Sequence, residues 1–148
     1  MALTQGYKFK LQKLLDIREK EEEDKKIVFM EALQSKNKVE SNLKNLEDNM
    51  KKYSQISNEM STIDRKVQSQ YLNLLNSTID LTKKDLKKQE RKVETKRKDL
   101  VEAQVNKKIV GILKDKDEAR FIKEQSRIEQ IQNDEFALYG YIRESGRR

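Results

Sequence analysis

The chain contains no proline, cysteine, histidine or tryptophan, and only four of its 148 residues are glycine. Because proline breaks the interior of a helix, its absence permits very long helices. Without histidine or cysteine there is no Cys/His metal site, no histidine base and no thiol nucleophile. The lack of cysteine also excludes disulfides and fits a reducing compartment. We therefore expect a non-enzymatic protein with no catalytic residue, metal or cofactor.

Long apolar stretches are also missing. No run of 18 apolar residues occurs, so we expect no membrane-spanning helix. The first ten residues, MALTQGYKFK, lack the apolar region of a signal peptide, which makes a cytoplasmic location the expectation.

Charged side chains make up 40% of the chain and hydrophobic ones 34%. This abundance of Lys, Glu, Leu, Gln and Arg is typical of coiled coils and long helices. The apolar residues are too few for a compact globule but sufficient for a narrow seam between two helices. Disorder is the competing interpretation, but the apolar residues recur at helical spacing, which disordered chains need not show.

The first half of the chain follows one heptad frame, with apolar residues alternately three and four positions apart. This spacing predicts a helix over about residues 5–55. Polar residues occupy the seam positions between about 18 and 26, where an acidic block, EKEEED, covers 19–24. The apolar seam positions are Leu11, Leu15, Phe29, Ala32, Val39, Leu43, Leu46, Met50 and Tyr53.

The frame fails after Tyr53, where several Ser, Asn and Thr side chains compete with helical backbone hydrogen bonds. We predict a bend over about residues 55–61. Ser61 and Asp64 fit a capping box, in which Ser61 caps a second helix and Asp64 reaches back. A continuous helix through this point is the alternative.

The second helix is predicted over about residues 61–142, so the fold class is all-α: a long antiparallel two-helix coiled-coil hairpin with an extended C-terminal helix, in a single domain spanning 1–148. Its seam repeats every seven residues. Polar companions at Thr82, Gln89 and Lys96 indicate a seam that is weak in its centre. The repeating apolar positions are Leu72, Ile79, Leu86, Val93 and Leu100, with Leu75, Ala103 and Val110 as companions.

Charge offers a test of the register. Residues 83–98 hold nine basic and three acidic side chains. A bend centred on residue 58 places the acidic block 19–24 beside residues 92–97, and opposite charges flanking a seam select its register. In this register residues 115–148 have no partner in the first helix.

Two surfaces are candidates for protein contacts. Near the bend, Tyr71 and Leu74 lie beside the seam line, where a locally thick core is the alternative to partner binding. The apolar tail, within residues 115–148, is the second candidate, and self-association is the alternative to partner binding there. The bend-end residues are Leu46, Met50, Tyr53, Tyr71, Leu74 and Leu75. The terminal residues are Leu11, Leu14, Phe121, Ile128, Ile131, Phe136 and Tyr139.

Three segments resemble the bacterial flagellar export protein FliJ family. The opening YKFKLQKLLDIREKEEEDKK (7–26) is similar to the family's aromatic, basic and Leu-rich start. Ser61 is followed ten residues later by Tyr71-Leu72-x-x-Leu75, which is similar to the segment after the family's bend. Near the end, RIEQIQNDEFA (127–137) resembles the family's Glu-Gln-x-x-x-Asp-Glu motif. The three segments span nearly the whole chain in the family's order.

The resemblance implies an antiparallel coiled coil similar to the central stalk of rotary ATP synthases. Such proteins bind the hexameric flagellar export ATPase, promote its ring assembly, connect it to the membrane export-gate protein and escort export chaperones. By analogy, the terminal residues enter the ATPase ring and the bend-end residues face the gate. The implied location is cytoplasmic, at the cytoplasmic face of the inner-membrane export apparatus, without membrane insertion.

Two other functions fit the composition. A generic coiled-coil scaffold or tether shares everything except the three segments. A nucleic-acid-binding coiled coil is less favoured, because the basic stretch 83–98 has no interleaved aromatic residues and the predicted register covers it with the acidic block. We therefore expect no nucleic-acid partner.

Overall fold

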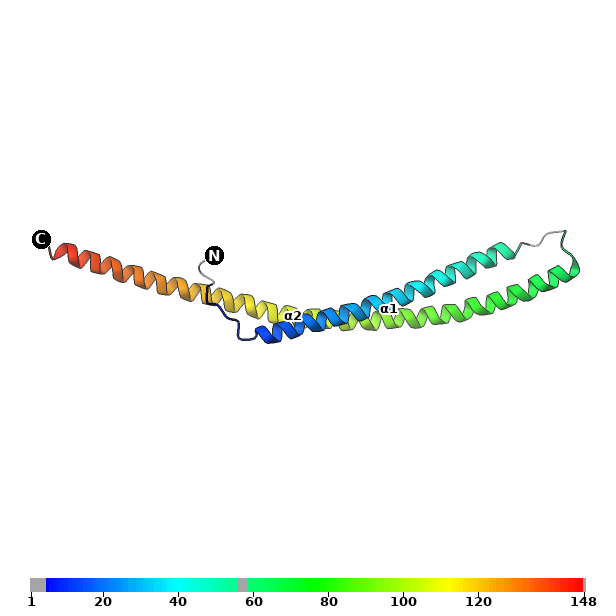
Figure 1. Ribbon diagram of the computed structural model, residues 1–148, viewed down its shortest axis with the longest axis horizontal. Coiled ribbons are helices and arrows are strands. Elements are labelled where there is room, and N and C mark those ends of the chain that lie inside the picture. The colour runs from blue at the N-terminus through cyan, green and yellow to red at the C-terminus, as the bar shows by residue number, and fades with distance from the viewer. Residues whose placement is uncertain (1–4, 56–58, 148) are drawn as a thin grey trace. The chain divides into compact units, whose positions relative to one another are not determined.

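The computed structural model describes residues 5–55 and 59–147, and its secondary structure there is two long helices. Helix α1 spans Gln12–Tyr53 and helix α2 spans Thr62–Ser145 (Figure 1). The helices pack against each other as an antiparallel hairpin, which confirms the predicted all-α fold. The chain divides into two units: the described residues up to Glu21 together with those from Gln104 onward, and Glu22–Ala103.

The second unit, Glu22–Ala103, is the hairpin closed by the bend. Its part of α1 lies beside its part of α2, from the cyan and green ends inward (Figure 1). Contacts between side chains join the two helices in this unit. The Tyr53 and Tyr71 rings meet edge to face with centroids 5.4 Å apart, Lys83 Nζ lies 4.0 Å from Glu47 Oε1, and the Arg97 guanidinium lies 5.9 Å from the Phe29 ring centroid.

The heptad frames predict which side chains turn inward. Buried apolar residues all fall on predicted seam positions: Leu15, Ala32, Leu75, Ile79, Val93, Ala103 and Val110. Most of the other predicted seam residues are half-buried: Phe29, Val39, Leu43, Leu46, Met50, Leu72, Leu86 and Leu100. Leu11 and Tyr53, also predicted in the seam, are exposed. Half-burial is expected in a two-helix seam, because each side chain is covered from one side only.

Polar side chains interrupt this seam as predicted. Thr82, Gln89 and Lys96 are half-buried, and Gln89 Oε1 is an acceptor shielded from solvent without a hydrogen-bond partner. An unpaired buried amide oxygen costs about 1–3 kcal/mol. The centre of the seam is therefore its weakest section.

The helix boundaries differ from the prediction at the N-terminus. Helix α1 begins at Gln12 and not near residue 5. Gly6 has a φ of 88°, a conformation that side-chain-bearing residues rarely adopt, and Tyr7 is held against α2 by contacts described below. The segment before Gln12 therefore forms tertiary contacts with α2 and is not part of the helix. Helix α2 continues to Ser145, slightly beyond the predicted 142.

The second helix begins directly after Ser61. The Asp64 N–H donates to Ser61 Oγ at 3.2 Å, and the Ser61 hydroxyl donates to Asp64 Oδ2 at 2.7 Å. The first bond satisfies a backbone donor that the helix leaves without a partner at its N-terminus. The middle of the predicted bend, residues 56–58, lies outside the described residues.

The predicted register is wrong in both units. Within Glu22–Ala103, Phe29 was expected opposite residue 87 but contacts Arg97, ten residues further on. In the other unit, Gln12 was expected opposite residue 104 but bonds Lys114. The basic stretch 83–98 is therefore not covered by the acidic block 19–24. The cause is an asymmetric bend, in which the Gln68 side chain already reaches the carbonyl of Tyr53, so the first turns of α2 lie beyond the end of α1.

This register predicts a cross-linking pattern. A chain with Phe29→Cys and Lys96→Cys is expected to form an intrachain link with a short bis-maleimide, because both positions lie on the seam near the Phe29–Arg97 contact. A chain with Phe29→Cys and Lys87→Cys places the thiols about 15 Å apart along the axis and is expected to link poorly. The absence of native cysteine removes background reaction. Equal linking of the two pairs, resolved by mass spectrometry, contradicts the register.

Candidate partner-binding surfaces

The bend end presents two aromatic rings side by side. Tyr53 and Tyr71 pack edge to face at an interplanar angle of 83°, and 43% and 41% of their surfaces stay exposed. Lys52 Nζ lies 5.5 Å from the Tyr53 ring centroid, which gives the pair a cationic neighbour. Tyr53 and Tyr71 therefore stabilise the end of the hairpin and remain accessible to a partner.

The other predicted bend-end residues divide between the surface and the seam. Leu74 is 67% exposed and points away from the seam, whereas Leu46 and Met50 are half-buried. Leu75 is only 5% exposed. Its side chain is therefore covered by the hairpin, and of the predicted bend-end set the structure offers chiefly Tyr53, Tyr71 and Leu74 to a partner.

The sequence interpretation missed Gln68 at this end. Its Nε2 donates to the carbonyl oxygen of Tyr53 and, at 3.2 Å, to that of Gln55. The last carbonyls of a helix have no partner within it, so the Gln68 amide satisfies the end of α1 from α2. Gln68 lies four residues before Leu72, so an extension of the heptad toward the N-terminus was the available signal.

The N-terminal segment docks on α2 through Tyr7. The Tyr7 and Phe121 rings lie 5.3 Å apart between centroids, and the Tyr7 hydroxyl donates to Asp117 Oδ2 at 3.0 Å. Lys114 Nζ donates to Gln12 Oε1 at 3.0 Å. Phe121, predicted as a partner-binding residue, is therefore half-buried under Tyr7. The sequence interpretation noted Tyr7 as an aromatic of the opening segment but did not assign it this contact.

The environment of Tyr7 predicts that its hydroxyl group ionises at a higher pH than that of an ordinary tyrosine. Burial of the ring and the hydrogen bond to Asp117 raise its pKa from 10.0 to about 12. Because the folded pKa lies above the unfolded one, the stabilisation is fully present below pH 10 and is lost as pH rises through about 12. In ultraviolet titration at 295 nm, Tyr7→Phe is expected to remove the component that ionises last. Loss of an early component instead contradicts the hydrogen bond to Asp117.

The end of α2 is unpaired. Every described residue from 126 to 147 is exposed, whereas Phe121, shortly before this stretch, contacts Tyr7 in the segment that precedes α1. The predicted residues Ile128, Ile131, Phe136 and Tyr139 are 37%, 45%, 75% and 70% exposed. Leu11 is also exposed, whereas Leu14 is half-buried.

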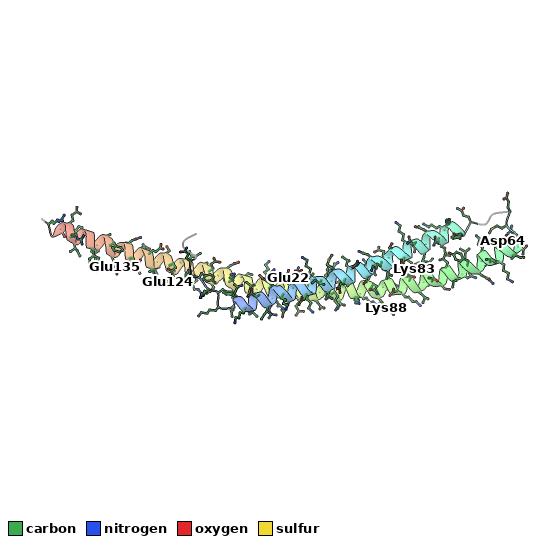
Figure 2. The ribbon with its side chains drawn as sticks, viewed as in Figure 1. Glu22, Asp64, Lys83, Lys88, Glu124 and Glu135 are labelled. Atoms are coloured by element: carbon green, nitrogen blue, oxygen red, sulfur yellow. The ribbon has the colours of Figure 1, made fainter. Side chains whose placement is uncertain are left out.

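This unpaired stretch continues the seam of α2. Heptad spacing from Val110 through Phe121 leads to Ile128, Ile131, Leu138 and Ile142, all of them exposed. Glu124 and Glu135, labelled in Figure 2, fall on the same line. Arg127 binds Glu124 with two guanidinium nitrogens, at 2.7 Å and 3.1 Å, and these bonds lower the pKa of the carboxyl group. The tail is therefore a seam without a second helix.

The family model described as Flagellar FliJ protein matches residues 7–146. The chain belongs to the flagellar FliJ family. No match is found among curated proteins or among solved structures. Membership in this family supports a role in flagellar protein export.

The three segments that resemble the FliJ family occupy both candidate surfaces. Segment 7–26 contains Tyr7 and the start of α1, and segment 127–137 lies on the exposed tail. Tyr71 and Leu75 lie at the bend end, one exposed and one in the seam. The family's sequence features therefore include residues of both candidate surfaces.

A membrane-spanning helix and a metal site are both absent from the part of the chain that the structure describes. In residues 5–55 and 59–147 no helix combines the length and apolarity needed to cross a bilayer. Within the same ranges, no three acidic side chains gather closely enough to bind a metal ion together.

Proposed function

We propose that this protein is a non-enzymatic component of the flagellar type III export apparatus that binds the hexameric export ATPase through its terminal residues and promotes ring assembly. The bend end contacts the membrane export-gate protein, and the protein escorts export chaperones. It acts at the cytoplasmic face of the inner membrane, without inserting into it. The family match over residues 7–146 supports the setting in flagellar export.

The unpaired seam of α2 is the main support for the proposed contact with the ATPase. Ile128, Ile131, Leu138 and Ile142 are apolar, exposed and spaced for a helical partner. Exposed apolar patches on water-soluble surfaces mark interaction sites. A stalk that enters a ring needs a helix with a free surface on all sides, and residues 126–147 provide one.

The bend end supports the proposed contact with the export-gate protein. Tyr53 and Tyr71 are exposed aromatic side chains on a hydrogen-bonded end of the hairpin, and aromatic residues are enriched where proteins bind one another. Because this surface belongs to one unit and the tail to the other, two partners are able to bind without competing for the same residues.

The test uses the full chain with a purified flagellar export ATPase. Co-elution on size exclusion, a shift of the ATPase toward hexamers and faster ATP hydrolysis are the expected results. A generic coiled-coil scaffold is the rival function, and it predicts neither co-elution nor stimulation. The absence of all three effects, with the protein helical by circular dichroism, contradicts the proposal.

A further inference from the structure

Helix α2 carries a second apolar line that α1 does not cover. Ile63, Val67, Leu74 and Leu81 are 76%, 60%, 67% and 66% exposed. At about 100° per residue these four side chains fall within about 40° of one another. They extend over about 27 Å of the helix axis. We call this line the second seam.

The second seam is separate from the one that α1 occupies. Leu75 and Ile79, both buried against α1, lie about 120° around α2 from the centre of the second seam. The spacing of the second seam is heptad-like, since Val67, Leu74 and Leu81 are each seven residues apart and Ile63 precedes Val67 by four. Gln70 and Ser77, exposed and uncharged, fill the intermediate heptad positions. The pattern is that of a coiled-coil face.

The same line becomes basic toward the C-terminus. The next heptad positions after Leu81 are Lys84, Lys88 and Arg91, all exposed. Among the described residues, none of these three has a carboxylate at ion-pair distance, whereas Lys83 lies 4.0 Å from Glu47 of α1. Figure 2 labels Lys83 on the side of α2 near α1 and Lys88 on the opposite side. The three charges are therefore available to a partner that follows the second seam.

The geometry distinguishes between kinds of partner. A helix that lies on a membrane buries a whole apolar face among the lipids, whereas the second seam is a line only about 40° wide. In a parallel second copy, the three basic residues face their own equivalents, and like charges across a seam repel. An antiparallel copy covers the apolar residues but leaves the basic positions without opposite charges. A partner helix with an apolar face and an acidic extension covers the apolar residues and also pairs with the three basic ones.

We infer that the second seam binds an amphipathic helix of a partner protein, apolar at heptad spacing along Ile63–Leu81 and acidic where it meets Lys84, Lys88 and Arg91. The bound helix forms a three-helix section with α1 and α2. The inference shares Leu74 with the proposed gate surface and otherwise goes beyond the proposed function. Its test contains neither ATPase nor gate protein, so its failure is distinguishable from theirs.

The probe is a synthetic helical peptide of about 29 residues, the length of Ile63 to Arg91, with Leu and Ile at its seam positions and Glu at the last three. A second peptide carries the three Glu at its amino end, which covers both orientations. A third replaces Glu by Lys. Binding to the full chain is measured by fluorescence anisotropy. We expect one Glu peptide to bind and the Lys peptide to bind at least about tenfold more weakly.

Neighbouring lysines provide the matched control. Lys88→Glu is expected to weaken the Glu peptide about threefold or more, whereas Lys87→Glu, an equal charge change about 100° away around the helix, changes binding less than twofold. Leu74→Gln with Leu81→Gln is expected to weaken it about tenfold or more. Lys84→Glu with Lys88→Glu is expected to restore binding of the Lys peptide. All these sites are exposed, so unchanged circular dichroism verifies the fold of each variant.

Three results overturn the inference. Equal effects of Lys87→Glu and Lys88→Glu indicate nonspecific attraction to a basic protein. A dimer in analytical ultracentrifugation that Leu74→Gln with Leu81→Gln dissociates, without peptide binding, assigns the second seam to another copy of the chain. Binding to phosphatidylserine vesicles that the same double variant abolishes, again without peptide binding, assigns it to a lipid surface.

Discussion

Replacing Leu75 by Asp is expected to lower the free energy of unfolding by about 3–5 kcal/mol, whereas replacing Leu74 by Asp lowers it by less than about 1 kcal/mol. The two leucines are adjacent in the chain and sit in the same helix. Leu75 is 5% exposed and Leu74 is 67% exposed. The change at Leu75 removes an apolar side chain from the seam and leaves a carboxylate with little access to water.

The large effect at Leu75 follows from the narrowness of the core. In a two-helix seam, each layer has few neighbours to compensate for a lost side chain, and the adjacent section already contains the polar residues Thr82 and Gln89. Ile79, which is also 5% exposed, is the only buried residue within four positions of Leu75 on α2 among the described residues. A charge at Leu75 is therefore expected to open the bend end of the hairpin.

Urea unfolding followed by ellipticity at 222 nm measures the difference. Helix propensity falls by a similar amount in both variants, so it cancels in the comparison. Leu75→Ala is a second check, with an expected loss of about 2–4 kcal/mol from the lost burial alone. Equal destabilisation by Leu74→Asp and Leu75→Asp contradicts the assignment of Leu75 to the seam.

The contrast between Leu74 and Leu75 shows what the sequence was able to predict. Apolar residues at intervals of three and four define a line on a helix, and that line specifies which of two adjacent leucines turns inward. The prediction required no knowledge of the partner helix. Ser61 similarly gave the start of α2 within one residue, because a capping side chain acts on the backbone next to it.

The register was not predictable in the same way. Heptad seams align equally well after a shift of seven residues, so the apolar pattern alone does not choose among registers. Charge matching does not choose among them either, because a chain in which 40% of the side chains are charged offers favourable pairs in many registers. The structure fixes the offset through specific contacts such as Gln68 with the Tyr53 carbonyl, and these depend on the geometry of the bend.

The predicted start of α1 was wrong for a different reason. Lys, Leu and Gln favour helix in the segment after Gly6, and local propensity predicted one there. Tyr7 instead contacts Phe121 and Asp117, which lie more than 100 residues away in the chain. A long-range contact of this kind leaves no periodic signal in the sequence. The tertiary contacts of Tyr7 therefore outweigh the local helix propensity of this segment.

On the tail, Ile128→Glu combined with Ile131→Glu is expected to weaken binding of the export ATPase by about 30-fold or more. A residue at the centre of a protein interface contributes about 2 kcal/mol or more, which corresponds to this factor. Both isoleucines lie on the unpaired seam of α2, 37% and 45% exposed. Glutamate is a good helix former, so the tail is expected to stay helical while losing its apolar line.

Ile112→Glu provides the matched control for the tail. Ile112 is 44% exposed on the same helix and in the same unit, but it lies about 160° around the axis from Ile128. Affinity measured by biolayer interferometry, together with ATPase stimulation, is expected to change less than twofold in this variant. Both variants introduce acidic charge, so a general electrostatic effect weakens both. A loss confined to Ile128→Glu with Ile131→Glu therefore assigns the ATPase contact to the unpaired seam, whereas unchanged binding in that variant places it elsewhere on the chain.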